Sequence, residues 1–244
     1  MEEKQLIIKI KSSQGGLGKA DGSELAPDEV QKYLDESFEM DEVEIISSNI
    51  EETNKNIEEK ALQVLDKKPI FLGGDHSITF PLFKAFTKKY KSPVLLIFDA
   101  HVDMSNDFLP PTHEDFNKTL IEQKIIKPEN LMIVGARKIY DVEKTYIKQK
   151  NIQILEKIDL EKIKEFVKDK DVYLSIDIDV LDPSEAPGTG YPEKGGLKTS
   201  DLLNLLAEIK PKAVDITEIN PKKDIDNKTT KLGSKIIVKL AQSL

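Results

Sequence analysis

Short apolar runs rich in β-forming residues alternate along this chain with longer amphipathic stretches. The eight expected strands lie at Leu6–Ile10, Val43–Ser47, Pro69–Leu72, Val94–Phe98, Leu131–Val134, Ile152–Leu155, Val172–Ile176 and Ala213–Ile216. Helical patterns separate most of them, at Ile57–Lys67, Ile78–Tyr90, Tyr140–Gln149, Leu160–Lys168, Asp201–Ile209 and Thr229–Leu240. This alternation predicts βαβ units and therefore a parallel sheet with helices on both faces. Because no linker-like composition shift occurs, we expect one domain over residues 1–244.

Charge and composition exclude several classes of protein. The net charge is −8, with 36 Lys and Arg against 44 Asp and Glu, which argues against a binder of nucleic-acid phosphates. No apolar run approaches the roughly 18–20 residues of a membrane helix, and the start MEEKQLIIKI does not resemble a signal peptide. The chain has no cysteine for disulfides or thiolate chemistry. We therefore expect a cytoplasmic protein without nucleic-acid or membrane partners.

Three stretches rich in Gly, Pro and small polar residues interrupt the alternation, at Ser12–Asp28, Asp103–His113 and Val180–Lys198. The last two closely follow predicted strands. In an open α/β sheet, ligands bind outside the carboxyl ends of the strands. We therefore expect the functional residues in these loops.

Carboxylates and imidazoles gather at three of the predicted strand ends. The six side chains are His76 after the third strand, Asp99, His101 and Asp103 after the fourth, and Asp177 and Asp179 after the seventh. Side chains at alternate positions share one face of an extended chain, so each group is expected to converge. All three histidines of the chain, including His113, fall in such loops.

A cation is the simplest explanation for this gathering of acids. Four carboxylates packed together repel one another strongly unless they are compensated, and neither acidic cluster contains Lys or Arg. Six protein ligands, four of them carboxylates that can bridge, suit two ions better than one. Mixed imidazole and carboxylate ligands favour Mn²⁺, with Zn²⁺, Fe²⁺ and Co²⁺ also compatible.

Five motifs along the chain resemble those of a known enzyme family. They are Gly73–Ser77 (GGDHS), Asp99–Asp103 (DAHVD), Ser175–Pro183 (SIDIDVLDP), Ala186–Glu193 (APGTGYPE) and Asp215–Pro221 (DITEINP). Together they resemble the ureohydrolase family, which includes arginase, agmatinase and formimidoylglutamase. The resemblance implies a three-layer α/β/α sandwich of the arginase/deacetylase-like type, with a mostly parallel, eight-stranded sheet. It also implies two Mn²⁺ ions per chain and a homo-oligomer, either a trimer or a hexamer.

The resemblance further implies a role for each site residue. One ion would be held by His76, Asp99, Asp103 and Asp177 and the other by His101, Asp99, Asp177 and Asp179, with Asp99 and Asp177 bridging. Hydroxide formed between the ions would attack a linear guanidino carbon and release urea and an amine. His113 would carry a proton to the leaving amine, and Glu218 would bind the guanidinium through paired N–H···O bonds.

Other residues near the motifs have less specific roles. Asp75 and Asp182 are expected to orient ligands or cap helices, and Glu193 to be either structural or close to the guanidinium. Where the family usually has Gly after the histidine, this chain has Glu114. Two interpretations stay open: the added acids tune the imidazole of His113, or a helix begins here and His113 only precedes it.

The sequence leaves alternatives for the activity. A deacetylase-like amidohydrolase would use one zinc ion, and a non-catalytic scaffold would have lost at least one of the six ligands. Within the family, the substrate is agmatine, arginine or formimidoylglutamate. The spacing from Asp103 to His113 and the scarcity of arginine for a distal carboxylate favour agmatine. Arg137 is the only arginine in the chain. It is either a structural residue or the one arginine that could bind such a carboxylate.

Overall fold

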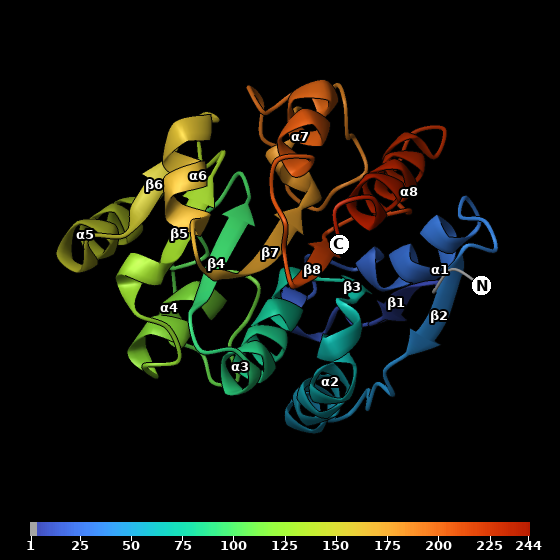
Figure 1. Ribbon diagram of the computed structural model, residues 1–244, viewed down its shortest axis with the longest axis horizontal. Coiled ribbons are helices and arrows are strands. Elements are labelled where there is room, and N and C mark those ends of the chain that lie inside the picture. Colours follow the sequence, from blue (N-terminus) through green and yellow to red (C-terminus); the bar gives the residue numbers. More distant parts are fainter. Residues whose placement is uncertain (1–3) are drawn as a thin grey trace.

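The computed structural model describes residues 4–244, and eight strands within them form one parallel sheet. The strands are β1 (Gln5–Lys9), β2 (Phe38–Glu42), β3 (Ile70–Leu72), β4 (Pro93–Phe98), β5 (Leu131–Val134), β6 (Gln153–Leu155), β7 (Asp171–Asp177) and β8 (Ala213–Thr217). Their order across the sheet is β2-β1-β3-β8-β7-β4-β5-β6 (Figure 1). The last strand of the chain is therefore near the centre of the sheet.

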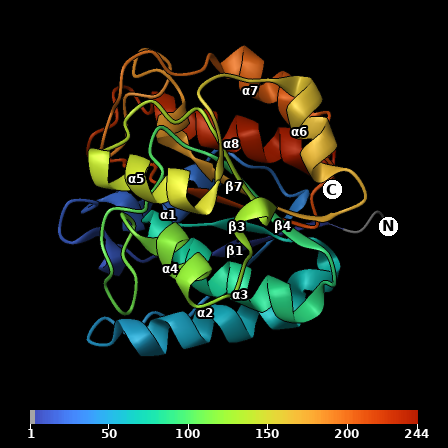
Figure 2. The ribbon, with the colours of Figure 1, turned by 90° about the vertical axis from the view of Figure 1, so that its left-hand side faces the viewer.

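Helices cover both faces of this sheet and make a three-layer α/β/α sandwich, as expected (Figure 2). The helices are α1 (Ala26–Gln31), α2 (Ile50–Val64), α3 (Thr79–Lys89), α4 (Phe116–Glu122), α5 (Asp141–Lys150), α6 (Leu160–Val167), α7 (Thr199–Leu206) and α8 (Lys228–Ala241). Apolar side chains of α2, α3 and α4 pack in one core, and those of α1, α6, α7 and α8 pack in the other. Within the described residues, no helix has both the length and the apolar character needed to cross a bilayer.

The register of the four central strands aligns their carboxyl ends. Leu72 of β3 pairs with Ile216 of β8, Ile216 pairs with Ile176 of β7, and Ile176 pairs with Phe98 of β4. The residues that follow these four strands therefore emerge side by side at one edge of the sheet. Because all four strands are parallel, segments far apart in the sequence meet at that edge.

Three features of the fold differ from the sequence prediction. The second strand is β2, not Val43–Ser47, because β2 is an edge strand whose half-exposed, acidic sequence FEMDE lacks an apolar run. The helices α1 and α4 were not predicted, since they span only six and seven residues, too few to show a helical period clearly. Helix α2 begins at Ile50 rather than Ile57, because Asn49 accepts hydrogen bonds from Glu51 N and Glu52 N and so caps its first turn.

Candidate metal centre and active site

The loop after β3 brings His76 to the edge of the sheet. A Cβ on Gly74 would lie 1.9 Å from the carbonyl oxygen of Ser12, so only glycine allows this close approach of two backbone segments. Asp75 then accepts a hydrogen bond from Ser77 N at 2.8 Å and caps a short 3₁₀ turn, His76–Ile78. Gly15 N also donates to Asp75 at 3.0 Å, which ties the N-terminal loop to the site.

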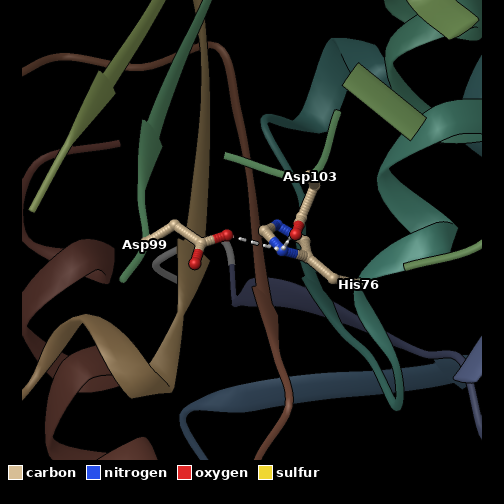
Figure 3. A group of neighbouring side chains, drawn as sticks. All are labelled: His76, Asp99 and Asp103. Carbon is tan, nitrogen blue, oxygen red and sulfur yellow. Dashed lines mark ion pairs between the residues drawn. The ribbon is translucent and has the colours of Figure 1, made fainter. Parts of the chain in front are cut away.

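His76 lies at the centre of a first group of carboxylates. Its Nδ1 is 3.1 Å from Asp99 Oδ2, 3.2 Å from Asp103 Oδ2 and 3.3 Å from Asp177 Oδ2. Figure 3 shows the carboxylates of Asp99 and Asp103, both from the loop after β4, approaching the imidazole of His76 from different sides. All four side chains are buried. Asp103 reaches this position with a φ of 52°, a left-handed conformation that a non-glycine residue adopts at a cost.

His101 is the centre of a second group that shares Asp99 with the first. Its Nδ1 is 2.9 Å from Asp179 Oδ2 and 3.5 Å from Asp99 Oδ1. Asp99, His101 and Asp179 form one potential ligand set, and His76, Asp99 and Asp103 form another. Asp177 contacts the first set through His76, and its Oδ1 accepts the backbone N–H of Asp179 at 2.8 Å. The six predicted side chains therefore come together, with Asp99 between the two sets.

Unsatisfied buried atoms indicate that these sets fit cations. His76 Nδ1 and Asp99 Oδ2 are only 3.1 Å apart, yet within the described part of the chain neither has a hydrogen-bond partner. Buried polar atoms without partners are rare and costly, and a shared metal ion would satisfy both. The donors are imidazole nitrogens and carboxylate oxygens, which suit first-row divalent ions such as Mn²⁺ and Zn²⁺.

The pKa values of the carboxyl groups respond to this crowding. Burial, followed by the charge of Asp99, raises the pKa of Asp103 to about 7. Burial and neighbouring acids also raise the pKa values of Asp177 and Asp179. Burial acts in the same direction on Asp99, but the close approach of the His101 and His76 imidazoles outweighs it and lowers the pKa of Asp99. Without added positive charge, the cluster cannot be fully ionised near neutral pH.

A buried polar network supports His76 from behind and was not predicted from the sequence. His76 Nε2 lies 2.9 Å from Ser175 Oγ, which donates to Asp215 Oδ1 at 2.6 Å. Tyr173 OH and Thr79 Oγ1 donate to Asp215 Oδ2 at 2.8 and 2.9 Å. Ser175 and Asp215 are paired residues on the neighbouring strands β7 and β8. In the sequence, the network could have been recognised only by the acid Asp215 within the otherwise apolar strand AVDIT. The network holds the ring so that Nδ1 faces the carboxylates.

His113 and Glu218 form an adjacent buried pair. His113 Nδ1 is 3.1 Å from Glu218 Oε1, and the same oxygen accepts the backbone N–H of His76 at 2.9 Å. Glu218 follows β8 with a φ of 61°, so this residue also adopts a left-handed conformation. Burial lowers the pKa of His113, but the hydrogen bond and charge of Glu218 outweigh it and raise the pKa to about 9. The imidazole is thus protonated at neutral pH.

The position of His113 resolves how the segment after it is built. His113 N donates to Gly15 O at 3.1 Å, and helix α4 begins three residues later, at Phe116, after the N-cap residue Asp115. His113 therefore precedes the helix, and its side chain still faces the site. The Nε2 atom of His113 is buried and has no hydrogen-bond partner within residues 4–244.

A cavity of about 420 Å³ connects these groups to the surface. Its lining includes five of the six candidate ligands, all except Asp99, together with His113 and Glu218. Lys19, Asn106, Glu114, Tyr140 and Tyr191 line it as well. Tyr191, from the loop between η6 (Ile178–Val180) and α7, packs near His113 and His101, with ring centroids 5.8 and 6.2 Å apart. The cavity is therefore walled by loops that lie far apart in the sequence.

The remaining predicted residues lie around this centre. Asp182 accepts hydrogen bonds from Ser184 and Gly195 and so shapes its own loop, and Glu193 Oε1 is 4.0 Å from His101 Nε2. The guanidinium of Arg137 donates to six backbone carbonyls, those of Gly135, Asp179, Val180, Leu181, Glu193 and Lys194. Arg137 thus joins the loop that carries Asp179 to the loop that carries Glu193.

Comparisons with known proteins agree with this architecture. The model of the Arginase family matches residues 16–242. The chain is 32% identical to agmatinase of Bacillus subtilis (strain 168), over 86% of this chain and 78% of that protein. It is 33% identical to a mitochondrial arginase of Medicago truncatula, over 77% of this chain and 60% of that protein.

Structural similarity extends over the whole chain. Formimidoylglutamase from Bacillus subtilis superposes with a TM-score of 0.88 at 22% identity, covering 100% of this chain and 88% of that one. These similar proteins are named for three different substrates, so similarity alone does not select one. The family match covers most of the chain, and the chain therefore belongs to the arginase family of hydrolases, whose members act on guanidino C–N bonds.

Proposed function

We propose that this chain hydrolyses agmatine to putrescine and urea, with two Mn²⁺ ions held at the carboxyl edge of the sheet. Arginase-family enzymes are binuclear metal enzymes. The observation that carries the proposal is the pair of ligand sets sharing Asp99 at the end of a cavity that also contains His113 and Glu218. Two sets rather than one also favour this activity over a deacetylase-like amidohydrolase with a single zinc ion.

Each ligand set would hold one ion. His76, Asp99 and Asp103 would hold the first and Asp99, His101 and Asp179 the second, with Asp177 beside the first set. When bound, two such cations lower the pKa of water to near neutrality and so supply hydroxide for attack on a guanidinium carbon. The Ser175–Asp215 network would keep His76 oriented as a ligand.

Glu218 and His113 would serve the substrate. The hydrogen bonds of Glu218 both end on Oε1, which leaves Oε2 to accept an N–H of the guanidinium. This differs from the expected contact through both carboxylate oxygens, because Oε1 is already occupied by His113 and the His76 backbone. The contact of His113 Nδ1 with the Glu218 carboxylate favours the protonated imidazole, which can give its proton to the leaving amine.

The chemistry of the described residues favours an amine tail on the substrate. The guanidinium of Arg137 is engaged by backbone carbonyls, so it is not available to bind a substrate carboxylate. The carboxylate of Glu114 lines the cavity and suits a cationic group. The similar agmatinase of Bacillus subtilis supports the same choice.

A substrate panel with metal analysis tests the proposal. Purified protein loaded with Mn²⁺ should release urea from agmatine faster than from arginine, 3-guanidinopropionate or 4-guanidinobutanoate, and should release no formamide from formimidoylglutamate. Elemental analysis should find two metal ions per chain. Lack of activity on every guanidine, or one tightly bound zinc ion per chain, would contradict the proposal and favour the amidohydrolase alternative.

A further inference from the structure

An ion pair that joins two distant loops lies beside the candidate proton carrier. Lys19 Nζ is 2.8 Å from Glu114 Oε1, and both residues line the cavity. The same Glu114 oxygen is 4.0 Å from His113 Nε2, whereas Glu218 is 3.1 Å from Nδ1 of that ring. Two carboxylates therefore face the two nitrogens of one imidazole. One carboxylate is buried beside the metal-ligand sets, and the other is nearer to solvent.

The two side chains of this ion pair differ in exposure and in the contacts that hold them in place. The Lys19 side chain is 50% exposed, and its other described contact is with the Tyr191 ring, 6.0 Å from Nζ to the centroid. The Glu114 side chain is 29% exposed, follows the buried His113, and accepts a further hydrogen bond from Asn106 Nδ2 at 3.4 Å. Exposed ion pairs contribute little to stability, so Lys19 can leave at small cost. The charge that stays at the cavity wall is then negative.

From this asymmetry we propose that Glu114 determines substrate specificity by binding the distal ammonium of the guanidine substrate in place of Lys19. The inference rests on the proposed function, since it assigns the far end of the same substrate. A molecule with a guanidinium at one end of a short flexible chain and an ammonium at the other meets a carboxylate at each end, Glu218 and Glu114. A substrate ending in a carboxylate would meet the negative charge of Glu114 and be disfavoured.

A cycle that removes either charge tests this contact. The substrates are agmatine, 1-butylguanidine, which lacks the ammonium, and 4-guanidinobutanoate, which carries a carboxylate instead. The variants are Glu114→Gln and Lys19→Gln, with Glu29→Gln as the matched control, because Glu29 forms an exposed ion pair with Lys32 outside the cavity. Titration calorimetry with putrescine and with 1-aminobutane measures binding of the tail without catalysis.

A charge-assisted hydrogen bond predicts a loss of roughly tenfold in kcat/KM for agmatine in Glu114→Gln, carried mainly by KM. In the same variant, kcat/KM for 1-butylguanidine should change by less than about twofold, because this substrate has no ammonium to pair with the carboxylate. For 4-guanidinobutanoate, kcat/KM should rise, because the negative charge that repels its carboxylate is removed. Lys19→Gln should raise kcat/KM for agmatine, because a competing cation is removed. Putrescine should bind more weakly to Glu114→Gln than to the Glu29→Gln control, and 1-aminobutane equally to both.

Two results would overturn the inference in different ways. If Glu114→Gln lowers kcat/KM for agmatine and for 1-butylguanidine by the same factor, or lowers neither, Glu114 does not bind the ammonium. The proposed function would still stand in that case. If the unchanged protein hydrolyses none of the three guanidines, the proposed function fails and this inference fails with it.

Discussion

Arg137 gives the sharpest test of how the loops around the metal-ligand sets are held. Its guanidinium is half-buried and donates six hydrogen bonds to carbonyls of three loop segments. The two shortest, both 2.7 Å, end on Asp179 O and Glu193 O. Substitution of Arg137 by Met removes all six and keeps a side chain of similar length.

The cost of Arg137→Met follows from those contacts. Hydrogen bonds to a charged group contribute about 1.5–3 kcal/mol each, so the two short bonds alone would contribute about 3–6 kcal/mol. The other four hydrogen bonds are longer, at 3.2 to 3.3 Å, and contribute less to stability. One of their acceptors, Val180 O, also keeps a hydrogen bond from Leu197 N at 2.9 Å when the guanidinium is removed. Allowing for water access to this half-buried group, we expect a loss of about 3–4 kcal/mol. That loss corresponds to a fall in Tm of roughly 10 °C for a chain of this size.

Urea unfolding followed by circular dichroism, together with Mn²⁺ titration, measures both consequences. Arg137→Lys keeps the charge and can reach only some of the carbonyls, so it should lose about half as much stability as Arg137→Met. Metal affinity should fall in both variants, because the backbone of the potential ligand Asp179 is no longer fixed. A loss below about 1 kcal/mol in Arg137→Met would refute the reasoning, since it would show that water replaces the guanidinium without penalty.

Three further predictions concern the centre itself. Asp177→Ala should abolish metal binding and hydrolysis together, measured by elemental analysis and urea release; full turnover without metal would contradict the mechanism. Asp215→Asn and Ser175→Ala should weaken Mn²⁺ binding roughly 10- to 100-fold in equilibrium dialysis, because they loosen a ligand without removing it; unchanged affinity would show that the network does not support the ligand. In metal-free protein, the raised pKa of His113 predicts stabilisation that is fully present below pH 6.5 and lost as pH rises through about 9. The difference in unfolding free energy between wild type and His113→Gln should therefore shrink over that range, and a constant difference would contradict the assignment.

The local pattern of the chain was sufficient to predict the main architecture. Apolar runs such as Val94–Phe98 and Val172–Ile176 are buried on both faces, as the alternation with helices requires for a parallel sheet. The edge strand β2 was not predicted, because a half-exposed strand that pairs on one side only does not need an apolar run.

The same logic predicted where the candidate ligands would meet. Carboxyl ends of parallel strands emerge at one edge, so Asp99 and Asp177 could be expected together once their strands were recognised. Alternation along an extended chain then added His101, Asp103 and Asp179 to the group. These inferences need only local periodicity and the direction of the strands.

The contacts between loops could not be predicted, because they depend on the order of the strands in the sheet. The local periodicity of the sequence gives no information on that order. Only the placement of β8 between β3 and β7 brings Glu218 to His76 and His113 and puts Asp215 behind His76. Lys19 reaches Glu114 across the fold for the same reason. The sequence by itself determined the parallel sheet apart from its edge strand β2, and the identity of the candidate ligands. The tertiary structure decided their partners, because hydrogen bonds and ion pairs act over a few ångströms between segments that only the packed core brings together.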